Sequence, residues 1–196
     1  FGLDSISGFF EVEQGMQKAT LEAFCDRFQM HGETAGRNAA GEHLIIQRLR
    51  ENITDDVQLS DEELLEYDRR IYMHTEAINA GRQVKGLEPI EWKYFQYLML
   101  LFTEIYLDYL FTKPELLVAG LNQQIERWNA KWIEEEKYRH KELLPIDVND
   151  DLWPQLNLVA YWSATGSGKT LVMHANILQY RFYQERYGSN HYGKTS

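Results

Sequence analysis

The sequence predicts a mainly α protein: an all-helical N-terminal domain followed by the start of an α/β unit. Three observations support this prediction. Apolar residues recur at helical spacing through most of residues 1–145. A break rich in proline and acidic residues follows, in "LLPIDVNDDLWPQ" (143–155). After the break, a short apolar run, a glycine-rich turn and a second helical pattern occur in the order strand, loop, helix.

The first 60 residues predict two helices and a loop. Residues 14–31 carry an apolar face at helical spacing. Residues 31–52 suggest a second helix, which glycines weaken at its start and which becomes firm from Glu42 onward. The polar stretch "TDDVQLS" (54–60) then reads as a loop.

The middle of the domain predicts two further helices. Ser60 and Glu63 stand at the spacing of a capping box, which opens a helix expected to end near Ala80. A long helix over about residues 91–112 is apolar on nearly every side, so we expect it at the centre of the domain. Its apolar run contains Gln96 and two acidic residues, which favours a buried soluble helix over a membrane span.

Pro114 suits the first turn of the next helix. An apolar stripe is expected along that helix, at spacings of four, four, three and four: Leu117, Leu121, Ile125, Trp128 and Trp132. At its solvated end, Glu135 and Arg139 are placed for an ion pair one turn apart. A domain boundary follows near residue 145, so we assign residues 1–145 to the helical domain and 150–196 to the α/β unit.

Charge and cysteine content restrict the function of the helical domain. Residues 1–150 hold 16 basic and 28 acidic side chains, a net charge of −12, whereas residues 151–196 have a net charge of +2. A surface this acidic repels the DNA backbone. We therefore do not expect this domain to be the part of the protein that binds nucleic acid. Cys25 is the only cysteine, which suits a reducing cytoplasm. The N-terminus lacks the pattern of a signal peptide.

The glycine-rich turn has the pattern of a phosphate-binding loop. Gly168, Lys169 and Thr170 match the end of the consensus, and Gly166 is its usual inner glycine. Glycine permits the backbone angles with which several amides point at phosphate oxygens. Lys169 can then reach the β- and γ-phosphates of a nucleotide, and the Thr170 hydroxyl can ligate Mg²⁺. The expected strand over 156–162 and the expected helix over 170–187 provide the context that this motif requires.

The string "SATGSGKT" (163–170), followed by "LVMHANILQY", resembles motif I of superfamily 2 DEAD/DEAH-type DNA helicases. In particular it is similar to the ATPase region of type III restriction enzyme Res subunits. The resemblance covers the stretch from Leu156 to about Tyr187. The first consensus glycine is replaced by Ser163, a departure from the pattern of many kinases and ring ATPases.

The resemblance implies a RecA-like motor lobe that hydrolyses ATP with Mg²⁺ and moves along, or separates, double-stranded DNA in a restriction or phage-defence system. It implies that Thr165, Gly166, Ser167, Gly168 and Lys169 line the phosphates and that Thr170 meets the metal. Lys169 is then the catalytic residue. The acidic metal box and the arginines of a second lobe are expected beyond residue 196, so residues 1–196 alone should not turn over ATP.

Two alternatives to a helicase remain open on the sequence. The chain can be a helical protein-interaction module with a vestigial nucleotide site, or another P-loop NTPase. The helical domain can dock against the motor or recruit partner subunits, and the sequence does not decide between these roles. Asp61 to Glu63 are better explained as first-turn acids, which the helix dipole favours, than as a metal box.

Gln96 follows two aromatic residues, as an adenine-reading glutamine does in helicases of this type. It lies 69 residues before Thr165, however, which is many more than such helicases normally have. We therefore interpret it first as a polar residue near the start of a buried helix. Glu104 and Asp108 stand one turn apart and can serve acid–base chemistry, although such a pair more often faces solvent or an arginine.

The remaining candidates favour structural roles. The histidines are scattered without ligand spacing, and Cys25 is expected to be a core thiol. Aromatic and arginine side chains near the C-terminus can stack on nucleotides, but packing of the helix after the loop is favoured: Tyr180, Arg181, Phe182, Tyr183, Arg186 and Tyr187.

Overall fold

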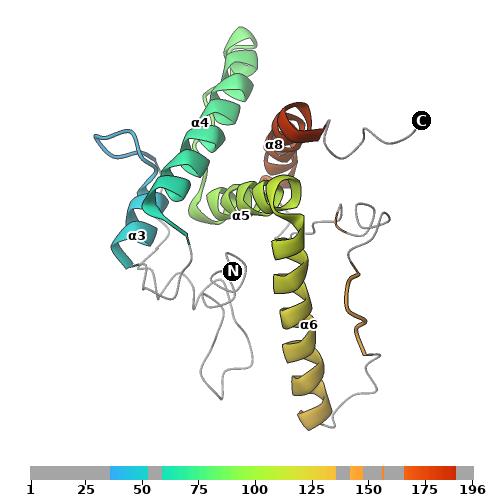
Figure 1. Cartoon of the computed structure of the whole chain (residues 1–196). Helices are drawn as coiled ribbons and strands as arrows, with labels where there is room; N and C mark the ends of the chain where they lie inside the picture. The colour runs from blue at the N-terminus through green and yellow to red at the C-terminus, as the bar shows by residue number, and fades with distance from the viewer. Residues whose placement is uncertain (1–35, 53–58, 136–141, 148–155, 157–165, 189–196) are drawn as a thin grey trace, which may run out of the picture.

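The computed structural model describes residues 36–52, 59–135, 142–147, 156 and 166–188. Within these residues the chain is mainly helical and contains no strand, as the mainly α prediction requires. The described helices are α3 (Leu44–Asn52), α4 (Asp61–Val84), α5 (Tyr94–Thr112), α6 (Pro114–Glu135) and α8 (Lys169–Tyr187) (Figure 1). The helix expected over 14–31 lies outside the described residues, as does the expected strand except for Leu156, which is helical rather than extended.

α3 is shorter than the sequence predicts. It begins at Leu44, whereas a helix was expected over 31–52 with a firm start at Glu42. The described residues before it form a loop, because Gly36 and Gly41 adopt φ of 87° and 81°. A right-handed helix cannot include residues in that left-handed region, so these two glycines exclude the helix from this stretch.

The capping box at the start of α4 is confirmed. The Ser60 hydroxyl accepts from the Glu63 backbone N–H at 3.2 Å, and the Glu63 carboxylate accepts from the Ser60 N–H at 2.9 Å. The helix extends to Val84, past the end expected near Ala80. Gly81 lies inside the helix, and the chain turns only at Gly86, whose φ is 66°.

α5 is the central helix, as predicted. It packs against α4, α6 and α8, and Figure 1 shows it crossing the middle of the molecule. More than half of its residues are buried: Gln96, Tyr97, Leu98, Leu100, Leu101, Thr103, Glu104, Ile105, Leu107, Tyr109, Leu110 and Phe111. Among the described residues, no helix is long and apolar enough to cross a membrane.

α6 begins at Pro114, as predicted, and turns away from the other helices (Figure 1). Its apolar stripe is buried only at its beginning. Leu117 is inaccessible to solvent and Leu121 is half-buried, but Trp128 is 50% exposed. The Trp132 side chain and the pair expected between Glu135 and Arg139 lie outside what the structure describes.

α8 packs in the angle between α4 and α5. Its buried residues are Val172, Ala175, Gln179 and Tyr183, at helical spacings of three, four and four. The aromatic residues expected to pack, rather than to stack on nucleotides, do contact the core: Tyr180, Phe182, Tyr183 and Tyr187.

A buried carboxylate, Asp68 of α4, fastens the loop before α3 to the bundle. Arg37 donates to both of its oxygens at 2.9 Å, and the Tyr97 hydroxyl donates at 2.6 Å. The His43 backbone N–H donates to the same group at 3.1 Å, and the His43 ring stacks on Tyr97 at 3.6 Å between centroids. Four donated hydrogen bonds compensate the desolvation of this carboxylate.

A second buried carboxylate, Glu104 of α5, faces α8. Gln179 donates to it at 2.6 Å and the Tyr183 hydroxyl at 3.1 Å. The Arg70 guanidinium of α4 lies 3.7 Å from it, and Arg70 also approaches Asp108 at 3.8 Å. The expectation that Glu104 and Asp108 face an arginine is therefore confirmed, and the pair is part of the packing of three helices.

Replacing Asp68 by alanine is expected to destabilise the fold by about 3–5 kcal/mol, because the Arg37 guanidinium loses its carboxylate partner at a partly buried site. Asp61→Ala is the matched control. Asp61 pairs with Arg50 at 3.0 Å but is largely exposed, so a loss below about 1 kcal/mol is expected. Urea unfolding of both variants checks this difference, and equal losses would contradict it.

Glu104 is expected to make stability depend on pH. Burial raises its pKa from 4.5 to about 7, so the fold favours its neutral form. Its contribution is complete below pH 4.5 and is lost as pH rises through 7, a fall on the order of 3 kcal/mol. Urea unfolding of the wild type and Glu104→Gln at pH 5 and pH 8 tests this.

The difference in stability between the wild type and Glu104→Gln isolates the effect of Glu104. Two buried histidines also titrate, because burial lowers the pKa of His43 and of His74 to about 4. These two histidines favour folding increasingly as pH rises from 4 to 6.5, the opposite direction, and they do so in both proteins. The wild type should lose stability relative to Glu104→Gln between pH 5 and pH 8. A constant difference between the two proteins would contradict the assignment.

Candidate functional site

The predicted phosphate-binding loop has the backbone geometry that its glycines suggest. Gly166 and Gly168 both adopt φ of 80°, in the left-handed region that favours glycine. Gly168 is the N-cap of α8, and its carbonyl accepts from the N–H groups of Leu171 and Val172 at 2.9 and 3.2 Å. The turn therefore leads directly into the first turn of a helix.

The start of α8 combines three features that attract an anion. The first N–H groups of a helix have no acceptor within the helix, and the helix dipole makes this end positive. Lys169 and Thr170 are the first two residues of α8, and both are exposed. In phosphate-binding loops in general, backbone donors, an ammonium and a hydroxyl at such a helix start act together on a phosphate group.

The side chain of Gln96 supports this loop from the side of α5. Its Nε2 donates to the Ser167 carbonyl at 2.7 Å, and its Oε1 accepts from the Lys93 N–H at 3.0 Å. The carboxamide thus joins the start of α5 to a loop 71 residues later in the chain. The interpretation of Gln96 as a polar residue near the start of a buried helix is confirmed, and its contact with the loop is a feature that the sequence did not predict.

Gly166, Ser167, Gly168, Lys169 and Thr170 of the predicted site lie in the turn before α8 and in its first turn. Thr165 and Ser163 lie outside the described residues. The place of Gln96 after two aromatic residues signalled contact with adenine, not the hydrogen bond to Ser167. Arg70, Gln179 and Tyr183 had no such signal, because only tertiary packing brings them to Glu104.

Metal-ligating residues do not cluster in the described part of the chain, where no group of three or more histidine, cysteine, aspartate or glutamate side chains could hold an ion. Glu63 is engaged in the cap of α4 rather than in a metal box. His43 and His74 are buried, and burial keeps their pKa values near 4, so both are neutral. Cys25, His31 and His140 lie outside the described residues.

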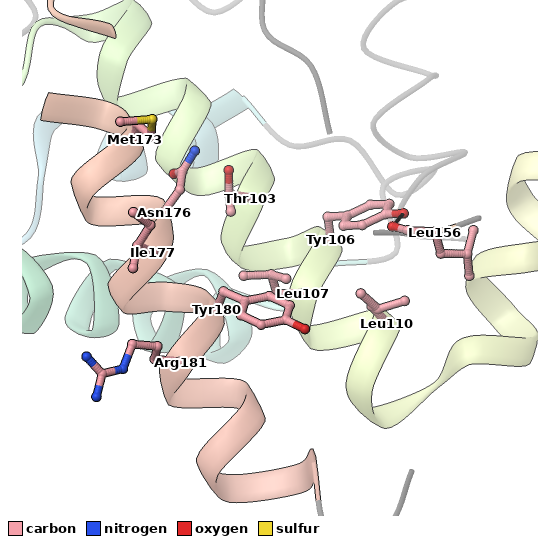
Figure 2. Close-up of a pocket in the computed structure, with 10 residues that line it drawn as sticks. All are labelled: Thr103, Tyr106, Leu107, Leu110, Leu156, Met173, Asn176, Ile177, Tyr180 and Arg181. Atoms are coloured by element: carbon pink, nitrogen blue, oxygen red, sulfur yellow. Dashed lines mark hydrogen bonds between the residues drawn. The ribbon is translucent and has the colours of Figure 1, made fainter. Parts of the chain in front are cut away.

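A cavity of about 280 Å³ lies between α5 and α8, past the first turn of α8 (Figure 2). The side chains around it are mostly apolar: Thr103, Tyr106, Leu107, Leu110, Leu156, Met173, Asn176, Ile177, Tyr180 and Arg181. Tyr106 donates to the Leu156 carbonyl at 2.6 Å, which holds Leu156 against α5. With this lining the cavity suits apolar side chains, and the residues of the predicted phosphate-binding loop take no part in it.

No family model, curated protein or solved structure matches this chain. The case for the site therefore depends on its own geometry.

The two loop glycines give a matched pair of variants. Both have φ of 80°, so alanine at either position costs about 1–2 kcal/mol in backbone strain. A Cβ at Gly166 meets open space, whereas one at Gly168 overlaps Gln96 Nε2. Gly168→Ala should therefore cost more than Gly166→Ala in urea unfolding, and Gln96→Ala should remove the excess when combined with Gly168→Ala. Equal costs would contradict this placement of Gln96.

Proposed function

We propose that this chain is the N-terminal part of an ATP-dependent DNA helicase or translocase of a restriction or phage-defence system. The observation that supports the proposal is the loop from Gly166 to Thr170: two left-handed glycines lead into α8, with an exposed lysine and threonine at its first turn. The similarity of "SATGSGKT" to motif I of superfamily 2 helicases supports the class of motor.

In this proposal the loop binds the triphosphate of ATP. The backbone N–H groups near Gly166 and Gly168 and the ammonium of Lys169 hold the phosphate oxygens, and Thr165 and Ser167 complete the lining. Lys169 also offsets the negative charge that develops as the γ-phosphate is transferred, which makes it the catalytic residue.

In this proposal Thr170 ligates Mg²⁺. Thr170 is an exposed residue in the first turn of α8, next to Lys169, so its hydroxyl fits the role of one oxygen ligand. When bound, Mg²⁺ neutralises phosphate charge and orients the β- and γ-oxygens. One hydroxyl does not complete a magnesium site, so the remaining ligands come from the phosphates, from water and from an acidic residue elsewhere in the protein.

The proposed partner is double-stranded DNA, bound through parts of the motor other than residues 1–150. Residues 1–150 have a net charge of −12, which would repel the phosphates of DNA. The helical domain is proposed to dock on the motor or on partner subunits. The contact between Gln96 and Ser167 gives it a direct connection to the nucleotide loop. A cytoplasmic location fits a chain with a single cysteine.

ATP hydrolysis by the intact protein that contains this chain is expected to increase when duplex DNA is added. Lys169→Ala should reduce turnover by at least 100-fold, because the lost ammonium stabilises the transition state. The control is Lys85→Ala, which removes an exposed lysine at the end of α4 and should leave turnover unchanged.

The same assay separates the alternatives. ATPase activity that duplex DNA does not stimulate would favour another P-loop NTPase. No activity, with no effect of Lys169→Ala on ATP binding, would favour a helical interaction module with a vestigial nucleotide site. Full activity in Lys169→Ala would contradict the assignment of the loop.

A further inference from the structure

Two asparagines of α6 hold the segment 142–147 by its backbone alone. Asn122 Nδ2 donates to the Ile146 carbonyl at 2.9 Å, while its Oδ1 accepts from the Ile146 N–H at 2.7 Å. Asn129 makes the same pair of bonds with Leu143, at 2.8 and 3.1 Å. Each carboxamide therefore satisfies both main-chain polar groups of one residue, as a neighbouring strand does in a hydrogen-bonded pair of an antiparallel sheet.

The spacing of the two asparagines matches the repeat of an extended chain. Seven residues of an α-helix rise about 10.5 Å and return to nearly the same face after two turns. Three residues of a polyproline-type chain rise about 9 Å and also return to the same face. The segment runs antiparallel to α6, since Asn129 holds Leu143 and Asn122 holds Ile146 (Figure 1).

The composition of the segment suits this mode of binding. Pro145 stands between the two clamped residues, where no N–H is needed, and it favours an extended conformation at Leu144. Ile146 packs against the hydrophobic core, whereas Leu144 is 78% exposed. This face of α6 thus binds the main-chain groups of two residues that stand three apart in the segment, and Ile146 is the one apolar side chain that packs.

We propose that this face of α6, the asparagine clamp (Asn122 and Asn129), is a peptide-binding site that also accepts residues 142–147 of a second copy of this chain. The four hydrogen bonds involve only the clamp and the segment, so they are the same within one chain and between two. Within one chain the segment benefits from a high effective concentration, so exchange is favoured at high protein concentration.

Such exchange requires that the segment can leave its own clamp at low cost. Its described side chains are exposed apart from Ile146, which is half-buried against the core, and the hydrogen bonds described for its backbone go to the clamp. Segments with few buried contacts open locally at a small fraction of the global unfolding free energy. The clamp itself is built on a helix and keeps its geometry when the segment leaves.

Two complementary variants test the proposal. Leu143→Pro with Ile146→Pro removes both N–H donors of the segment and leaves the clamp open. Asn122→Leu with Asn129→Leu removes the clamp and leaves the segment intact. Each variant alone should remain monomeric in light scattering, and an equimolar mixture should form a heterodimer. A fluorescent peptide "KELLPIDV" (141–148) should bind the open-clamp variant at least tenfold more tightly than the wild type.

The controls identify the clamp as the site. Arg127→Leu, which places the same side chain on an exposed position on the opposite side of α6, should leave peptide binding to the open-clamp variant unchanged. A peptide with proline at both clamped positions should not bind. Circular dichroism verifies that each variant keeps its helices, and Leu143→Pro alone replaces the double variant if it does not.

Three outcomes would overturn the proposal or part of it. Failure of the peptide to bind a folded open-clamp variant would overturn the peptide site. Binding that persists after both asparagines are replaced would overturn the assignment to the clamp. Peptide binding without a heterodimer would overturn the second copy as occupant.

Discussion

The seating of α8 on α5 is the interaction on which the position of the glycine loop depends. At one end of α8, Gln96 holds the Ser167 carbonyl, and about three and four turns into the helix Gln179 and Tyr183 donate to Glu104. These bonds are directional, so α8 cannot rotate or slide on α5 without leaving a buried carboxylate or amide unpaired. The loop from Gly166 to Gly168 is therefore held in place by the helical part of the chain.

The two buried carboxylates of the bundle are compensated in different ways. Asp68 receives a bidentate guanidinium, a hydroxyl and a backbone N–H, and it secures the loop that precedes α3. Glu104 relies on the neutral donors Gln179 and Tyr183, with Arg70 only at 3.7 Å, and burial raises its pKa. A carboxylate that meets mostly neutral donors retains part of its desolvation penalty, so Glu104 is the titrating contact of the three-helix junction.

Local rules predicted most of the helices but not all of their ends. The capping box at Ser60 and the proline at the start of α6 were reliable because they depend on neighbouring residues. α4 continues through Gly81, which costs only about 1 kcal/mol in an exposed helix and is offset by packing elsewhere. The apolar stripe predicted more burial along α6 than the structure shows. A stripe indicates which face of a helix is apolar, but not how far a packing partner extends along that face.

Of the candidate site, the loop residues were evident from the sequence, since glycines and Lys-Thr within a few residues of one another define a local geometry. The contacts that hold the loop and α8 in place were not evident from the sequence. Gln96 lies 71 residues from Ser167, and Gln179 lies 75 residues from Glu104. The asparagine clamp was not evident from the sequence either. The rise of seven residues in α6 matches that of three residues in the segment 142–147, and this match shows only when the two lie side by side.

The sequence by itself determined the helical class, the positions of most described helices and the residues of the phosphate-binding motif, because each follows from interactions within about one turn of chain. Only the tertiary structure decided which polar side chains meet at the loop, at Glu104 and along α6. Those contacts join residues far apart in the chain, and no spacing along the sequence encodes a distance that packing alone creates.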